Sequence, residues 1–292
     1  DIKIDQNGNI YVLGTLNYTT SPTEVILKKY DPSGTETWSR TISWMNDNYG
    51  ISLALDDQAT SYAAFTSFDN LGFSDAVVAT WDVNGNPGWT SGYLGFGGSP
   101  DAHKIKVDSL HNCFLFVESI TALTDRDMSV EKFDATGSFR MEVRYDGASH
   151  LADFCYDMDI DNHGFAYITG STSSPTTDLD MVVAKLDLNG TVGSIDWSTV
   201  YDSPTGGYDH GNKITTDPFG NVYASGLAEP PNQDADFIIF KYNGSGTELW
   251  RTTYNAPADG FHTPDAGIFS TGLGEVYVAG HGLWDDSTSS DY

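Results

Sequence analysis

Positively charged residues are scarce in this chain of 292 residues. There are 14 Lys and Arg against 41 Asp and Glu, which gives a formal net charge of −27 at pH 7. Binding to nucleic acids and to anionic membrane surfaces depends on contacts between Lys or Arg and phosphate groups. The composition therefore argues against both kinds of partner.

Long hydrophobic runs are also missing. No apolar stretch approaches the roughly 20 residues that span a bilayer, and no basic-then-apolar signal segment opens the sequence. We therefore expect no membrane insertion. Because the first residue is Asp1 and not Met, we expect either a processed mature protein or an excerpt of a longer chain.

Helical periodicity is absent too, and a repeat of about 50 residues takes its place. A short apolar motif recurs at steps of 51, 52, 53, 56 and 54 residues, and it is led by Tyr11, Tyr62, Phe114, Tyr167, Tyr223 and Tyr277. A strand and a turn precede each motif, and in the first five repeats two further strands separated by a turn follow it. Four short antiparallel strands per repeat predict the blade of a β-propeller.

The sequence thus predicts an all-β protein, a β-propeller with six evident blades of which the last is incomplete. We expect a single domain over residues 1–292, with repeats at approximately 1–47, 48–100, 101–152, 153–208, 209–264 and, in part, 265–292. The sixth repeat stops where its third strand should begin. Either the natural chain continues, or another chain supplies the strands by strand addition and so builds an assembly.

One repeat carries a specific resemblance. Residues Asp217 to Gly226 have the pattern Asp-x-x-Gly-Asn-x-Tyr-x-x-Gly, followed by a strand from Asp236 to Tyr242 and a turn and strand from Gly246 to Trp250. This pattern resembles the SBBP-type β-propeller repeat of bacterial and archaeal proteins. The resemblance implies a secreted or cell-surface location, and most members of the family lack an assigned activity.

Two turns depart from the family's pattern. Blade 2 has Asp57-Gln58-Ala59-Thr60 in place of the glycine-bearing turn, and blade 3 has Ser109-Leu110-His111-Asn112. We expect these two turns to be irregular.

Charged residues are phased with the repeat. Aspartates begin most turns, where they are expected to bind backbone N–H groups. The first strands of blades 3, 4 and 5 carry charges between their apolar positions, namely Lys104 and Lys106, Asp157 and Asp159, and Lys213. Because first strands line the axis of a propeller, we predict inter-blade ion pairs among these residues. The alternative is an axial ligand site that uses Asp157 and Asp159.

Pairs of aspartates precede or begin three of the predicted third strands. They are Asp125 with Asp127, Asp178 with Asp180, and Asp234 with Asp236. Such a pair places two carboxylates on one side of the chain about 7 Å apart, and Ca²⁺ prefers hard oxygen ligands. These six residues are candidate Ca²⁺ ligands, and no other cofactor is expected. Alternatively, each aspartate caps a strand or keeps the loop face soluble.

The chain has only two cysteines and three N-glycosylation sequons. Cys113 and Cys155 lie in neighbouring repeats, where they either form one disulfide between blades or remain free. Asn17, Asn189 and Asn243 fall in predicted loops or turns and fit N-glycosylation. Asn189 and Asn243 are also ordinary turn residues.

Catalytic signatures are absent. We find no Gly-x-Ser-x-Gly, His-Glu-x-x-His, phosphate-binding loop or Cys-x-x-Cys motif. We therefore expect a non-enzymatic extracellular scaffold or binding module of a cell-surface or filamentous assembly, with or without Ca²⁺, whose partners are proteins, further copies of itself or a glycan. The alternative is a carbohydrate-active propeller enzyme, a hydrolase or lyase, with paired carboxylates about 5–10 Å apart in an axial pocket.

Overall fold

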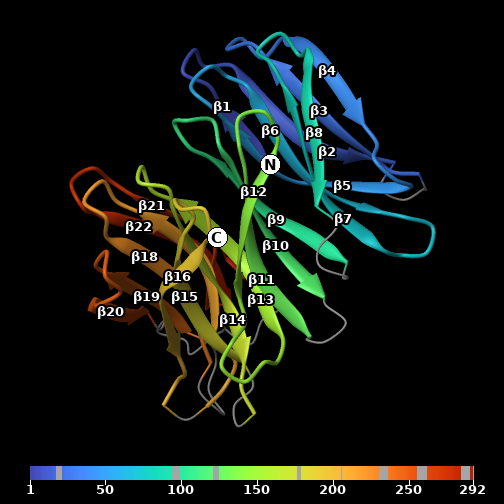
Figure 1. Cartoon of the computed structure of the whole chain (residues 1–292). Coiled ribbons are helices and arrows are strands. Elements are labelled where there is room, and N and C mark those ends of the chain that lie inside the picture. Colours follow the sequence, from blue (N-terminus) through green and yellow to red (C-terminus); the bar gives the residue numbers. More distant parts are fainter. Residues whose placement is uncertain are drawn as a thin grey trace. The chain divides into compact units, whose positions relative to one another are not determined.

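The computed structural model describes residues 1–17, 22–93, 99–120, 125–175, 179–204, 206–229, 236–254, 262–283 and 290–291. Within these ranges all regular elements are β-strands, arranged as five four-stranded sheets and one three-stranded sheet (Figure 1). Each sheet consists of strands that are consecutive in sequence, and the registered neighbours are antiparallel. The prediction of an all-β chain of repeated four-stranded blades is confirmed.

We number the sheets as blades 1 to 6 in chain order. Blade 1 comprises β1 (Ile2–Ile4), β2 (Ile10–Leu16), β3 (Glu24–Tyr30) and β4 (Glu36–Ile42), and blade 2 comprises β5 (Asp47–Leu55), β6 (Ser61–Phe68), β7 (Ser74–Trp81) and β8 (Pro87–Tyr93). Blade 3 comprises β9 (Pro100–Val107), β10 (Cys113–Ile120), β11 (Arg126–Phe133) and β12 (Phe139–Tyr145), and blade 4 comprises β13 (Asp153–Ile160), β14 (Phe165–Ser173), β15 (Leu179–Asp187) and β16 (Ser194–Tyr201). Blade 5 comprises β17 (His210–Thr216), β18 (Val222–Ala228), β19 (Asp236–Tyr242) and β20 (Glu248–Tyr254), and blade 6 comprises β21 (His262–Ser270), β22 (Val276–Leu283) and the short β23 (Ser290–Asp291).

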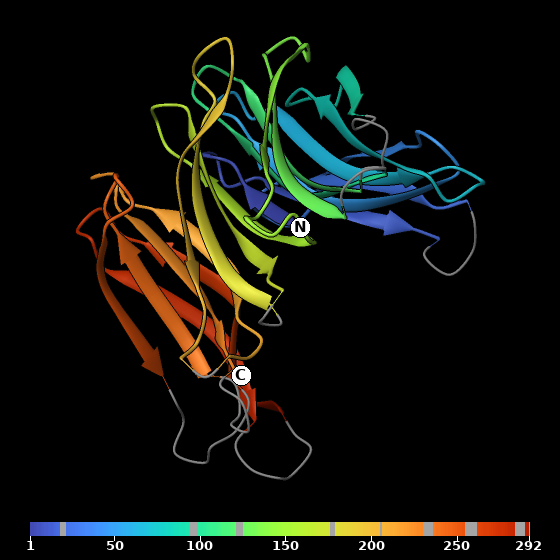
Figure 2. The ribbon, with the colours of Figure 1, turned by 60° about the horizontal axis from the view of Figure 1, so that its bottom comes forward.

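The chain divides into two compact units, Asp1–Glu142 and Val143–Tyr292, with the boundary inside β12. Blades 1 and 2 and most of blade 3 belong to the first unit, and blades 4 to 6 belong to the second. The strands within a blade are twisted, as the blue and cyan strands of blades 1 and 2 illustrate in Figure 2. The prediction of a single domain over the whole chain stays a prediction.

A recurrent hydrogen-bonded turn joins the first two strands of a blade. In blade 5, Asp217 Oδ1 accepts the N–H groups of Phe219 and Asn221, each at 2.9 Å, and its Oδ2 accepts the Tyr223 hydroxyl at 3.1 Å. Burial by itself would raise the pKa of Asp217, but these bonds and one from the Asn221 side chain lower it overall. The structural interpretation of the turn aspartates is therefore confirmed.

The corresponding turns of blades 2 and 3 keep this geometry without a glycine. Ala59 N–H donates to Asp56 O at 3.1 Å and His111 N–H to Asp108 O at 3.0 Å, as the turn glycines do elsewhere. Ala59 and His111 adopt positive φ angles of 61° and 60°. The prediction of irregular turns was wrong, because the aspartate side chain holds the turn even where a non-glycine residue must accept a strain of about 1–2 kcal/mol.

The hydrophobic core lies between neighbouring blades of each unit. Tyr11 and Leu27 of blade 1 pack with Leu53 and Phe65 of blade 2 in one buried cluster, and Tyr167 of blade 4 packs with blade 5 in another. A blade buries its apolar side chains only against its neighbour, which is the reason why the repeats stack.

A tryptophan of the fourth strand fastens each of several blades to the next. The pairs are Trp38 with Gly85, Trp89 with Gly137, and Trp197 with Gly246, in which the indole ring lies against a turn glycine of positive φ. The indole N–H donates to a backbone carbonyl of the same turn at 3.1–3.2 Å.

Blade 6 has less strand pairing at its end. β23 pairs with β22 only at Gly282 and Leu283. In the part of the chain that the structure describes, no helix is long and apolar enough to cross a membrane.

Candidate functional site

The predicted Ca²⁺ ligands fall into different environments. Asp125 is exposed, whereas Asp127 in β11 is buried. Asp180 is buried in β15, and Asp236 begins β19 with a partly buried side chain. Asp178 and Asp234 lie outside the described residues. Of the three predicted pairs, only Asp125 and Asp127 are both described, and their side chains differ in burial.

The first strands of blades 4 and 5 are joined through aspartate side chains. Asp157 Oδ2 accepts the N–H of Ile214 at 3.2 Å, and Asp159 Oδ2 accepts the N–H of Thr216 at 2.9 Å. Among the described residues, Lys213 takes part in no ion pair. Blade 5 therefore meets these two carboxylates with backbone N–H groups.

Lys104 and Lys106 lie on β9 in the first unit. Asp157 and Asp159 belong to the second unit, so the predicted pairing between the lysines and these aspartates stays a prediction.

The cysteines and the sequon asparagines have ordinary structural surroundings. Cys113 and Cys155 are both buried, and neither forms a disulfide in the structure. Asn17 is exposed at the end of β2, and Asn189 is exposed in the turn after β15. Asn243 Oδ1 accepts the N–H groups of Ser245 and Thr247, the role that aspartate has in the equivalent turns. Glycosylation at the three asparagines stays a prediction.

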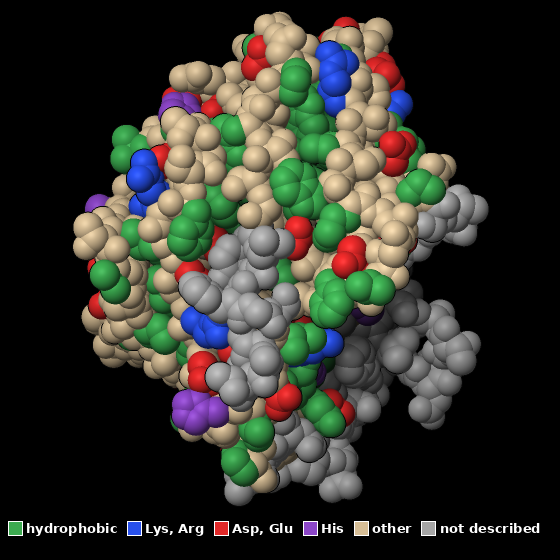
Figure 3. Space-filling view, turned by 45° about the vertical axis from the view of Figure 1, so that its right-hand side comes forward, with side chains coloured by type: hydrophobic (Ala, Val, Ile, Leu, Met, Phe, Trp, Pro, Cys, Tyr) green, Lys and Arg blue, Asp and Glu red, His purple; other side chains and the backbone are tan. Residues whose placement is uncertain are grey.

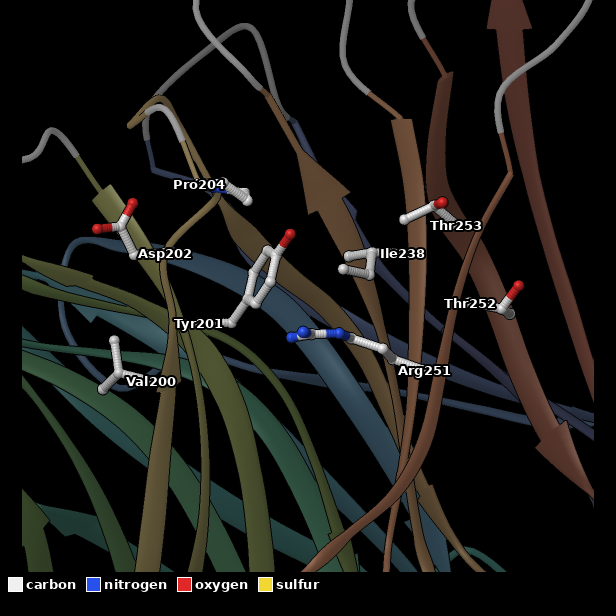
Figure 4. Close-up of a pocket in the computed structure, with 8 residues that line it drawn as sticks. All are labelled: Val200, Tyr201, Asp202, Pro204, Ile238, Arg251, Thr252 and Thr253. Atoms are coloured by element: carbon white, nitrogen blue, oxygen red, sulfur yellow. The ribbon is translucent and has the colours of Figure 1, made fainter.

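A pocket of about 670 Å³ lies between the fourth strands of blades 4 and 5 (Figure 4). Its lining consists of Val200, Tyr201, Asp202, Pro204, Ile238, Arg251, Thr252 and Thr253. In Figure 4 the Arg251 guanidinium and the Tyr201 ring point toward one another, and Asp202 points away from Arg251. The volume is within the roughly 300–1,000 Å³ that is usual for small-molecule sites.

The Arg251 guanidinium has capacity for a ligand. Its Cζ lies 5.6 Å from the centre of the Tyr201 ring, and its Nε lies 3.7 Å from Glu248 Oε1. It forms no hydrogen bond with any described residue. Tyr201 is held in turn by Phe240, whose ring centre lies 5.1 Å away. The pocket thus presents an oriented cation with unused N–H donors beside an aromatic ring.

Three carboxylates gather next to this pocket. Asp180, Asp202 and Asp209 each place one oxygen atom within 4.8 Å of the others. Asp209 is fully buried, and Ser203 N–H donates to its Oδ2 at 2.6 Å. Burial raises the pKa of Asp209 to about 6, although hydrogen bonds from the backbone partly oppose that effect. Asp202 belongs both to this cluster and to the pocket lining.

Outside such clusters, acidic side chains are scattered over the one face of the molecule that Figure 3 shows. On the face in Figure 3, the red side chains lie in small separate groups among polar and hydrophobic ones, and blue side chains are few. The strong net negative charge therefore does not gather on this face in one continuous patch.

Comparison with known proteins identifies the family of one of the repeats. Residues 143–175 match the SBBP β-propeller repeat. The matched SBBP repeat contains β13, β14 and the aspartate turn between them, and so confirms the predicted resemblance for this part of the chain. No curated protein matches the sequence.

Solved structures with the same fold have very different sequences. The β-propeller domain of the Trilobed protease from Pyrococcus furiosus has 7% identity and a TM-score of 0.51, over 100% of this chain and 83% of that one. A protein of unknown function from Dyadobacter fermentans has 11% identity and a TM-score of 0.51, over 96% and 92%. An ulvan lyase has 11% identity and a TM-score of 0.55, over 87% and 68%. These similarities establish the β-propeller fold.

Sequence reasoning missed the pocket between blades 4 and 5. Tyr201 and Arg251 are 50 residues apart in sequence and belong to different repeats, so no local motif links them. Arginines are few, but four of the five, Arg40, Arg140, Arg144 and Arg251, lie on fourth strands, so the sequence held no signal that sets Arg251 apart.

Proposed function

We propose that this chain is a non-enzymatic binding module at the cell surface, and that the pocket between blades 4 and 5 binds a carboxylate-bearing sugar. The observation that carries the proposal is the Arg251 guanidinium, which faces the pocket over Tyr201 with its N–H donors unused by described residues. The proposed location outside the cell rests only on what the resemblance to the SBBP repeat implies. Assembly into a larger surface structure is part of the same proposal.

The chemistry of the lining suits a uronic acid. A guanidinium binds a carboxylate through two parallel hydrogen bonds. Thr252 and Thr253 are exposed and offer hydroxyl groups to the hydroxyls of the sugar. Val200, Ile238 and the Tyr201 ring supply apolar surface for the C–H face of the ring. A ligand that bears both a carboxylate and hydroxyl groups uses all these features.

The enzyme alternative has less support. A second pocket, of about 260 Å³, includes Asp161 and Asp217, and both carboxylates already accept hydrogen bonds within their turns. The pKa of Asp217 is lowered, which is opposite to what a general acid needs. Asp209 does have a raised pKa, but it is fully buried and thus out of reach of a polysaccharide.

Binding of acidic sugars gives a direct test. Titration calorimetry with oligogalacturonate should give saturable heats, and the methyl-esterified oligosaccharide, which lacks the charge, should bind far more weakly. Substitution Arg251→Gln should weaken the binding of oligogalacturonate at least about tenfold, because charge-assisted hydrogen bonds contribute about 1.5–3 kcal/mol.

The control is Arg140→Gln, which changes another exposed arginine on a fourth strand. Arg140 is paired with Asp134 and lies outside the pocket. Its substitution should change the affinity by less than about twofold. Equal binding of the charged and esterified sugars, or equal effects of the two substitutions, would contradict the proposed site.

A further inference from the structure

The carboxylate cluster next to the pocket offers a set of oxygen atoms from three separate segments. Asp180 comes from β15, Asp202 from the segment after β16, and Asp209 from the residue before β17. Asp180 is 6% exposed and Asp209 is 0% exposed. Backbone N–H groups fix the Asp209 side chain, since Ser203 N donates to Oδ2 at 2.6 Å and Glu229 N to Oδ1 at 3.1 Å.

A buried hydroxyl provides an independent observation at the same place. Ser203 is 3% exposed, and its Oγ has no hydrogen-bond partner with acceptable geometry among the described residues. The N–H of the same residue donates to Asp209 Oδ2 at 2.6 Å, which places Ser203 beside the carboxylate cluster. A buried hydroxyl without a hydrogen bond carries a desolvation cost unless something else occupies the space that it faces. A cation held by the carboxylates would be such an occupant.

The equivalent position between blades 1 and 2 shows how the fold manages without a charged group. There Asn48 is the second residue of β5, and its Oδ1 accepts the N–H of Trp44 at 2.9 Å, as Asp209 accepts that of Ser203. The Asn48 Nδ2 donates to Thr23 O at 3.0 Å and to Met45 O at 3.3 Å. The side-chain amide of Asn48 thus donates hydrogen bonds at this position, which the ionised carboxylate of Asp209 cannot do.

From this geometry we propose that Asp180, Asp202, Asp209 and the Ser203 hydroxyl bind a Ca²⁺ ion between blades 4 and 5. All four groups are hard oxygen ligands, and they form an irregular set of the kind that Ca²⁺ tolerates better than Mg²⁺ does. The ion would join three segments of neighbouring blades and so stabilise their packing. The proposal does not depend on glycan binding, because Arg251 is not a ligand of the ion.

Calcium addition to the chelator-treated chain tests the site. In thermal unfolding at pH 7, Ca²⁺ at about 100 times its dissociation constant should raise the melting temperature by about 4 °C. Titration calorimetry with CaCl₂ should give saturable binding. Substitution Asp209→Asn should abolish both the shift and the tight binding, and the variant in EDTA should melt no lower than the wild type in EDTA, because Asn48 shows that asparagine fits this position.

The matched control is Asp125→Asn, at the exposed aspartate of a loop that also entered the predicted Ca²⁺ set. This variant should keep the full rise in melting temperature on addition of Ca²⁺. If the rise disappeared in this variant, the ion would bind at the loop of Asp125, and the proposal would be wrong. The competing occupant is a proton shared by the carboxylates. If the wild type ignores Ca²⁺ at pH 7 but melts higher as the pH is lowered to 5, the cluster holds a proton only and the proposal fails.

Discussion

Replacement of Gly137 by alanine is expected to destabilise the chain by about 3 kcal/mol. Gly137 has a φ of +81°, and a Cβ atom at this position would lie 2.5 Å from Trp89 Cδ2. The left-handed backbone costs a non-glycine residue about 1–2 kcal/mol. Displacement of a packed indole ring adds about 1–3 kcal/mol, and it also threatens the bond from Trp89 Nε1 to Ala135 O at 3.1 Å. Urea denaturation measures the loss.

Gly34→Ala separates the two contributions. Gly34 occupies the same kind of turn in blade 1 with a φ of +85°, but no atom lies within 4 Å of where its Cβ would be. This variant should lose only the strain energy, about 1–2 kcal/mol. If both substitutions cost the same, the contact between tryptophan and turn glycine contributes nothing to the stacking of blades.

This contact illustrates which parts of the fold could be predicted from the sequence. The repeated aromatic residues and turn aspartates predicted the number and type of strands, because each blade is encoded locally. The fourth strands were predicted, but the partners of their tryptophans were not, since Trp89 and Gly137 belong to different repeats. Contacts between blades depend on the register of one sheet against another, which a repeat pattern does not specify.

In the turns of blades 2 and 3, by contrast, a prediction from the local sequence was wrong. Absence of glycine at Ala59 and His111 suggested irregular turns, but the same hydrogen bonds form at positive φ. Asp56 Oδ1 accepts the N–H groups of Gln58 and Thr60 at 2.9 and 2.8 Å, and this arrangement outweighs the local preference of alanine. The aspartate is thus the residue that determines the turn, and the glycine is an adaptation to it.

The candidate sites required three-dimensional information for a similar reason. Sequence analysis placed Asp180 in a Ca²⁺ pair with its neighbour in the same loop. The structure instead brings Asp180 near Asp202 and Asp209, which follow it in the chain by 22 and 29 residues. Their proximity arises because the third strand of blade 4 and the first strand of blade 5 begin side by side, as the bridge between Leu179 and Tyr208 shows.

Substitution Asn48→Asp should destabilise the chain by about 4 kcal/mol at pH 7. Asn48 is fully buried, and its Nδ2 donates to Thr23 O and Met45 O. The carboxylate oxygen that replaces Nδ2 would face these two carbonyl oxygens with no donor, while the other oxygen would keep the Trp44 N–H and the Ser67 hydroxyl. A buried charge that is compensated so poorly costs about 3–5 kcal/mol. Asn70→Asp is the matched control, since Asn70 is exposed and its variant should change the stability by less than about 0.5 kcal/mol.

The loss at Asn48→Asp should depend on pH in a defined direction. The folded state disfavours the charged carboxylate, so its folded pKa must exceed the unfolded value of about 3.9. The penalty is therefore complete above the folded pKa and fades as the pH falls toward 4, where the protonated carboxyl can again donate one hydrogen bond. Urea denaturation of the variant and the wild type at pH 7 and pH 4.5 measures this difference. Equal losses at the two values would mean that the shape of the amide, and not the charge of its replacement, determines the stability of the junction between blades 1 and 2.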